Sequence, residues 1–151
     1  MELRLADLSE YQDVAACMAA FRDFLGDSEP STGQLIEGAR HVMSNELAEF
    51  VVAGTPAHSY VQLRYIWSAW HNTEICWVED VFVADHQRGK GVGWALMDFV
   101  SEHAAGRGCK RLQLDANEAN APGVALYEKA GFTNSNDWWG GGRDLFWVKQ
   151  L

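Results

Sequence analysis

A glycine-rich turn with two basic side chains is the part of this sequence best suited to chemistry. It reads Arg88-Gly-Lys-Gly-Val-Gly93, follows the apolar run Val81–Val83, and precedes a segment with helical periodicity. Glycines let a backbone turn tightly and approach a ligand closely, because no Cβ stands in the way. A helix that begins at such a turn offers unpaired N–H groups and the positive end of its dipole. The turn therefore predicts a phosphate-binding site.

The order of residues in this turn excludes two familiar phosphate-binding loops. A P-loop requires Ser or Thr after Gly-Lys, but here Gly91 follows Gly89-Lys90. A dinucleotide-binding GxGxxG loop requires a third glycine or a close substitute, and the two available registers end at Trp94 and Leu96. The remaining interpretations are another class of phosphate loop or a glycine-rich turn that binds no ligand.

The composition predicts one globular domain spanning residues 1–151. Hydrophobic residues make up 48% and charged residues 22% of the 151, which is near the average for globular chains. The net charge of −9 argues against nucleic-acid binding, which depends on clustered basic residues. Residues 1–50 carry three basic and ten acidic side chains, a net charge of −7. This imbalance favours a cationic partner, although an acidic solvated surface is the simpler explanation.

Neither a metal site nor a membrane segment is predicted. The three cysteines lie far apart, and the five histidines lack paired ligand spacing. No stretch approaches 18 consecutive apolar residues, and charged residues interrupt the N-terminal segment. The expected location is the cytoplasm.

Periodicity predicts alternating groups of helices and strands. Four segments have apolar residues at three- and four-residue steps, and six have strand-like alternation or β-branched and aromatic enrichment. We expect helices at about 11–25, 31–47, 92–106 and 122–130, and strands at 1–6, 50–53, 60–67, 74–84, 111–116 and 145–148.

Three motifs together resemble the GNAT-type N-acetyltransferase superfamily. Arg88-x-x-Gly91-x-Gly93 resembles the loop that binds the pyrophosphate of acyl-coenzyme A. Glu79-Asp-Val-Phe-Val83 is similar to the preceding strand of polyamine- and diamine-type members. Asn120 followed by Ala125-Leu-Tyr-Glu-Lys-Ala-Gly-Phe132 resembles the second coenzyme-binding segment. The resemblance implies an α/β fold with a mixed, mostly antiparallel sheet of about seven strands and about four helices.

The resemblance also implies which residues bind acetyl-CoA. The backbone of the strand residues would pair with the pantetheine arm, and these are Val81, Phe82 and Val83. The amides of the loop would hold the pyrophosphate, and these belong to Arg88, Gly89, Lys90, Gly91, Val92 and Gly93. Asn120 would contact the pantetheine or the adenosine, and Tyr127 would lie near the sulfur.

Three side chains are candidates for the chemistry of acetyl transfer. A phenol such as Tyr127 can donate a proton to a departing thiolate, although a lone helix tyrosine also packs without a catalytic role. Glu79 or Asp80 can anchor an ammonium group and accept its proton. Adjacent strand residues face opposite sides, so only one should point at a given reactant unless a bulge re-aims them. Glu79 shares the parity of Val81 and Val83 and is therefore the favoured base, while the other carboxylate is expected to stabilise the fold.

The sequence thus predicts an N-acetyltransferase that moves an acetyl group from acetyl-CoA to a primary amine, by direct attack, on a small cationic molecule. Two alternatives stay open: an enzyme that acetylates protein N-termini or lysines, and a non-catalytic acyl-CoA-binding module. A homodimer is common among similar proteins. Trp138 and Trp139, beside three glycines, could line an acceptor pocket or a dimer contact, or simply pack.

Overall fold

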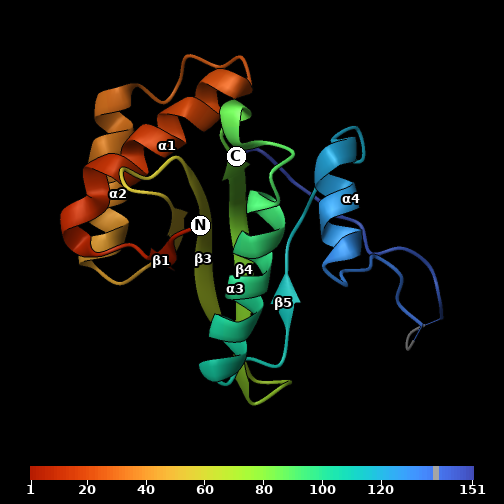
Figure 1. Cartoon of the computed structure of the whole chain (residues 1–151). Helices are drawn as coiled ribbons and strands as arrows, with labels where there is room; N and C mark the ends of the chain where they lie inside the picture. The colour runs from red at the N-terminus through yellow and green to blue at the C-terminus, as the bar shows by residue number, and fades with distance from the viewer. Residues whose placement is uncertain (138–139) are drawn as a thin grey trace. The chain divides into compact units, whose positions relative to one another are not determined.

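Five strands form one open sheet in the first part of the chain (Figure 1). The computed structural model describes residues 1–137 and 140–151, which fall into two compact units, Met1–Leu114 and Asp115–Leu151. Along the sheet the order is β1-β2-β3-β4-β5, with antiparallel pairing from β1 to β4 and a parallel pair between β4 and β5. The strands are β1 (Leu3–Leu5), β2 (Glu49–Ala53), β3 (Ser59–Ser68), β4 (Thr73–Val83) and β5 (Leu112–Gln113).

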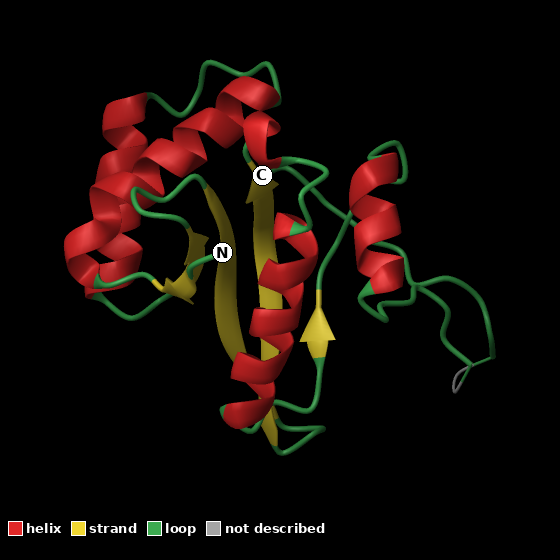
Figure 2. Ribbon diagram, in the orientation of Figure 1, coloured by secondary structure: helices red, strands yellow, loops and turns green. Residues whose placement is uncertain are grey.

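Helices cover both faces of this sheet, as the ribbon in Figure 2 shows. On one face, α1 (Tyr11–Phe24) and α2 (Thr32–Ser44) pack on each other, and Phe50, Tyr60 and Phe82 share a buried cluster with α1 and α2. Strand residues of the opposite parity face the other side. There α3 (Val92–Gly106) contacts β2, β3 and β4, and its most deeply buried residues are Leu96, Met97 and Val100.

The second unit contains α4 (Ala121–Lys129), whose two ends follow the sequence signals. Asn120 caps the N-terminus, since its side chain accepts a hydrogen bond from the Gly123 amide at 3.2 Å. Gly131 ends the helix with φ +88°, a left-handed conformation that glycine tolerates, as predicted. The Phe132 amide then donates to the Tyr127 carbonyl at 2.9 Å. None of the helices in the described residues is both long and apolar enough to cross a membrane.

The mixed, mostly antiparallel sheet with four α-helices is confirmed within the described residues, but the expected count of about seven strands is wrong, because five are present. The predicted last strand, Leu145–Val148, does not form. Its pattern is strand-like, yet Phe146 is 62% and Trp147 82% exposed. A strand needs a hydrogen-bonding partner as well as β propensity, and these residues have no strand pairing.

Candidate active site

The two adjacent carboxylates lie at an irregularity in β4. Gln62 of β3 pairs with Asp80, whereas Leu63 pairs with Val78, so Glu79 is an extra residue without a partner in the ladder. This is a β-bulge, which shifts the alternation of side chains by one residue. The predicted parity is therefore wrong: Val81 shares its face with Val78 and not with Glu79.

The bulge places both carboxylates on the same face of the sheet. The Arg64 Nε donates to the Glu79 carboxylate at 2.6 Å, and Asp80 acts on Tyr60 through a side-chain hydrogen bond and its charge. Tyr60 and Arg64 are four residues apart on β3, and residues an even number apart on a regular strand share a face. Tyr60 belongs to the core cluster that includes α1, so this is the face covered by α1 and α2.

The surroundings of the two carboxylates differ. Arg64 neutralises Glu79 in an ion pair that is partly open to solvent, with side chains 43% and 36% exposed. Asp80 is half-buried. Burial, and then the charge of Asp80, raise the pKa of the Tyr60 hydroxyl, so Tyr60 stays protonated and can donate to Asp80. Of the two, Glu79 is the carboxylate that Arg64 holds in an ion pair, while Asp80 faces the Tyr60 hydroxyl.

The carboxyl end of β4 leaves one edge of its backbone open. Val81, Phe82 and Val83 pair with β3 on one side. On the other side, β4 pairs with β5 only at Cys76 and Trp77, so among the described residues no strand extends the ladder along residues 78–83. An open edge can accept an extended ligand arm by backbone hydrogen bonds, as an added strand would.

The glycine turn presents its amides at the start of α3. Gly89 and Gly91 have φ of +72° and +81°, which side chains rarely adopt. Gly91 is the N-cap residue and has no side-chain cap. The first hydrogen bond of the α-helical ladder runs from the Ala95 amide to the Gly91 carbonyl at 3.0 Å, so the N–H groups of Val92 and Gly93 lie before that ladder begins. This arrangement suits a phosphate group.

The side chain of Arg88 stabilises the glycine turn. Its Nε donates to the Val83 carbonyl at 3.0 Å, and its guanidinium pairs with Asp85 at 2.9 Å. The same group lies 4.2 Å from the centroid of the Phe24 ring. These contacts tie the end of β4 and the short 3₁₀ turn η2 (Asp85–Gln87) to the glycines. The side chain of Arg88 thus holds the loop in shape.

The other predicted site residues belong to the second unit or lie outside the described residues. Asn120 caps α4, and Gly123 leaves room for it, since a Cβ there would meet the Asn120 side-chain amide. Tyr127 is half-buried on α4, edge-on to Phe132 with ring centroids 6.2 Å apart. Trp138 and Trp139 lie outside the described residues.

Sequence reasoning missed Arg64 and Tyr60, the partners of the carboxylates. Counting back from the hairpin between β3 and β4 pairs Ser68 with Thr73 and Arg64 with Trp77. That count alone would place Gln62 opposite Glu79. Nothing in the local sequence signals the extra residue, so the alternation of side chains predicts Glu79 on the face of Val81 unless a bulge intervenes.

Comparison with known proteins identifies the class. The model of the acetyltransferase (GNAT) family matches residues 11–132, so the chain belongs to this family. GNAT proteins use acetyl-CoA as cosubstrate. The solved structure of a protein from Arthrobacter sp. FB24, described as an acetyltransferase, superimposes with a TM-score of 0.90 at 22% identity, covering 100% of this chain and 96% of that one. At this identity the likeness concerns the fold.

Curated relatives match mainly one segment. Streptothricin acetyltransferase of Streptomyces lavendulae is 37% identical over 81 residues, which cover 54% of this chain and 38% of the relative. Thialysine N-epsilon-acetyltransferase of Mus musculus is 31% identical over 88 residues, covering 56% of this chain and 51% of that protein. The chain thus matches about half or less of these two relatives. An uncharacterized N-acetyltransferase of Bacillus subtilis, YhfO, is 26% identical with 87% and 89% coverage.

Proposed function

We propose that this protein transfers an acetyl group from acetyl-CoA to the primary amine of a small cationic molecule. The main support for this proposal is the arrangement of the bulge, the open backbone edge and the glycine turn along and after β4. Its bulge turns Glu79 and Asp80 to one face, and the strand then continues into an open backbone edge and a glycine turn at a helix N-terminus. A site for an ammonium group and a site for a phosphorylated thioester therefore belong to one continuous segment.

The coenzyme would be bound largely by backbone. The amides of residues 88–93 would receive the pyrophosphate, and the open edge of Val81–Val83 would pair with the pantetheine arm. The positive φ of Gly91 supports this role, because the turn it makes leaves the first amides of α3 available. The family resemblance adds Asn120 and Tyr127 to the residues proposed to bind the coenzyme, with Tyr127 near the sulfur.

The proposed reaction is direct attack without an enzyme-bound acetyl group. An alkyl ammonium ion has a pKa of roughly 10, so the amine must lose a proton before it attacks. We assign this proton to Asp80, because Arg64 already neutralises Glu79. The amine nitrogen forms a bond to the thioester carbon, the carbon–sulfur bond breaks, and Tyr127 supplies a proton to the departing thiolate. The proton that the nitrogen loses on becoming an amide then restores the phenol.

The proposed class of acceptor is based on the negative charge of the first 50 residues and on the names of the relatives. The first 50 residues carry a net charge of −7, and they include α1 and α2, which cover the face of the two carboxylates. The names of two relatives refer to thialysine and streptothricin. These observations favour a small amine over a protein acceptor.

The decisive experiment is an acceptor screen that measures release of the coenzyme thiol. Acetyl-CoA is supplied with polyamines, diamines, thialysine, aminoglycosides, amino acids and peptides bearing a free N-terminus or a lysine. We expect acceptor-dependent thiol release with at least one small cationic amine. Release with peptides alone would support the protein-acetyltransferase alternative. Acetyl-CoA binding with no release for any acceptor would support the non-catalytic module.

A further inference from the structure

The first unit contains a cavity at the end of the sheet opposite the glycine turn. Its volume is about 500 Å³, which lies in the range of small-molecule sites. One wall is apolar and includes Leu5, Leu8 and Leu47, whose side chains stay 39%, 49% and 53% exposed. The other wall carries ionisable side chains from β2, β3 and β4 and from Arg107, the C-cap residue of α3. A cavity that joins exposed leucines to fixed charges can accept a molecule with an apolar body and a polar group.

The polar wall is a connected network. Arg107 lies between two carboxylates, with Nε 2.8 Å from Glu74 and Nη1 3.2 Å from Glu49, and its guanidinium stacks 3.8 Å from the Tyr65 ring centroid. Glu49 also accepts from the Tyr65 hydroxyl at 2.8 Å and lies 2.8 Å from the His103 Nε2. Each carboxylate of this wall has a strong partner. The network is therefore a preorganised surface, with little capacity to bind a further charge.

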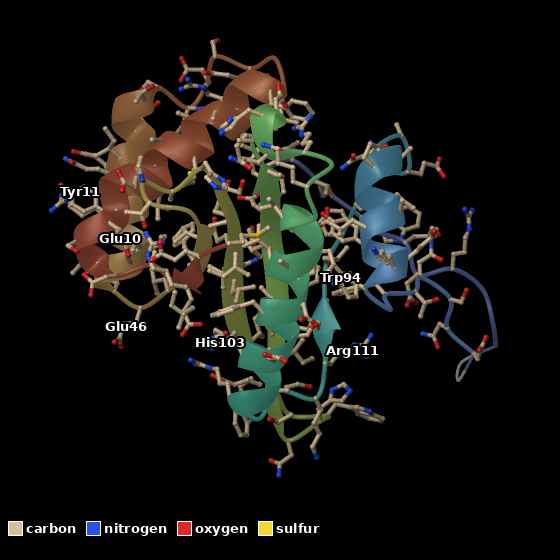
Figure 3. The ribbon with its side chains drawn as sticks, viewed as in Figure 1. Glu10, Tyr11, Glu46, Trp94, His103 and Arg111 are labelled. Carbon is tan, nitrogen blue, oxygen red and sulfur yellow. The ribbon has the colours of Figure 1, made fainter. Side chains whose placement is uncertain are left out.

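Glu46 at the mouth of the cavity differs from this network. No hydrogen bond or ion pair holds its carboxylate in the part of the chain that the structure describes. Figure 3 shows Glu46 projecting outward beyond the end of α2, apart from His103 on α3. Its backbone φ of +54° fixes it at the end of that helix, next to the exposed Leu47. The lining contains three glutamates against one arginine, so an entering cation would find a net negative surface.

The cavity is separate from the proposed acetyl-transfer site. Glu74 lies five residues before Glu79 on β4, which corresponds to about 16 Å along an extended strand. Glu74 pairs with Trp67, whose odd-numbered parity on β3 places it on the face opposite Arg64 and Tyr60. This charged wall is therefore on the other side of the sheet from Asp80, whereas Phe50 lines the cavity from the same side as Asp80, so the cavity extends around the end of the sheet. Its separation from the acetyl-transfer site comes from the distance along β4.

We propose that this cavity binds a small amphiphilic amine, with its ammonium group at Glu46 and its apolar chain against Leu5, Leu8 and Leu47. The volume of the cavity favours a small molecule. The unpaired Glu46 carboxylate beside exposed leucines favours a molecule with one cationic group on a short hydrocarbon chain. Both the acceptor amine itself and an unrelated regulatory amine could have such a cationic group on a short hydrocarbon chain. Either source would be bound at this cavity without being acetylated there.

The test is a binding titration of the full chain, without coenzyme, followed by backbone amide NMR. The probe is n-hexylamine at pH 7, and hexan-1-ol is the neutral control of the same length. We expect saturable shifts at residues 46–49 and at Leu8, with hexanol at least threefold weaker. Glu46→Gln should weaken hexylamine binding about two- to fivefold, the effect of an exposed ion pair. Glu37→Gln, on an exposed position of α2, should leave it unchanged.

Three results would overturn the inference: equal binding of hexanol and hexylamine, shifts confined to the region of Glu79 and Asp80, or equal affinity of wild type and Glu46→Gln. Leu47→Ser gives an independent check, because this exposed leucine can lose its apolar contact with little effect on folding. It should weaken both probes. All these measurements omit acetyl-CoA, so a failure of the transferase proposal leaves them interpretable. Adding spermidine, an acceptor candidate, as a competitor distinguishes the two sources of the amine.

Discussion

The two ends of β4 use their polar groups in opposite ways. At the carboxyl end, the open strand edge and the glycine turn leave backbone groups available to ligands, next to the bulge that carries Glu79 and Asp80. At the amino end, Glu74 is part of a network in which Arg107, Glu49 and Tyr65 satisfy one another. The comparison teaches that recognition at the first end depends on backbone geometry, while side-chain pairs at the second end fasten α3 to the sheet.

The largest effect is expected from Gly91→Asp, at the carboxyl end. Gly91 has φ +81°, which strains any side chain, and a carboxylate there would repel the phosphates. We expect acetyl-CoA affinity to fall at least about 100-fold, measured by calorimetric titration. The matched control is Gly106→Ala at the other end of α3, where a Cβ meets nothing within 4 Å. Unchanged affinity in Gly91→Asp would mean that the turn does not bind the coenzyme.

The next effect separates the two carboxylates of the bulge. Asp80→Asn removes the proposed base and should lower turnover of a cationic amine by about 10²-fold near pH 7. The loss should shrink as the pH rises toward the amine pKa, where the free amine needs no base. Glu79→Gln should have a smaller effect on turnover, because Arg64 already neutralises this group. The measurement is a pH–rate profile, and a larger loss in Glu79→Gln would assign the base to Glu79.

A comparable or smaller effect is expected from Tyr127→Phe, which tests whether the chemistry also needs the second unit. The ring and its edge-on contact with Phe132 are kept, so the free energy of unfolding should change by less than about 1 kcal/mol. Loss of the phenolic proton should reduce turnover by up to about 10²-fold. Pre-steady-state kinetics must show that acetyl transfer limits the rate. Equal turnover under that condition would make Tyr127 a packing residue.

At the amino end, we expect Arg107→Met to reduce stability without changing coenzyme affinity. The variant loses two ion pairs and the stacking on Tyr65, and the stacking alone contributes about 0.5–1 kcal/mol to the free energy of unfolding. Arg107 lowers the pKa of Glu74 below its ordinary value of 4.5. That contribution is therefore present above pH 4.5 and disappears as the pH falls through the lowered pKa. Denaturant melts at pH 7 and pH 3 should show the difference from wild type shrinking at pH 3.

The smallest effect is a gain of stability in Glu46→Gly. Glu46 ends α2 with φ +54°, while the Leu47 amide donates to the Val42 carbonyl at 2.8 Å. Glycine is preferred at this position of a helix end. The substitution should raise the free energy of unfolding by about 0.5–1 kcal/mol. Glu46→Gln keeps the strain and should match wild type in the same melts, and a destabilised Glu46→Gly would contradict this account.

The local signals of the sequence determined much of the molecule. Gly91 and Gly131 were expected to turn the chain at the start of α3 and the end of α4, and both have positive φ. These features depend on residues within one or two turns of each other, so a linear pattern records them. The order of helices and strands and the mostly antiparallel sheet followed from periodicity and family resemblance together. The coenzyme residues stay predictions.

Only the tertiary structure decided the bulge at Glu79, the pairing of Arg64 and the network around Arg107. Each depends on the register between segments 15 or more residues apart, where one extra residue moves every later side chain to the other face. The same reason explains Leu145–Val148: a strand-like pattern encodes a preference, whereas a strand exists only where a partner edge is in register. The sequence determined local turns and types of element, and the fold decided which side chains meet.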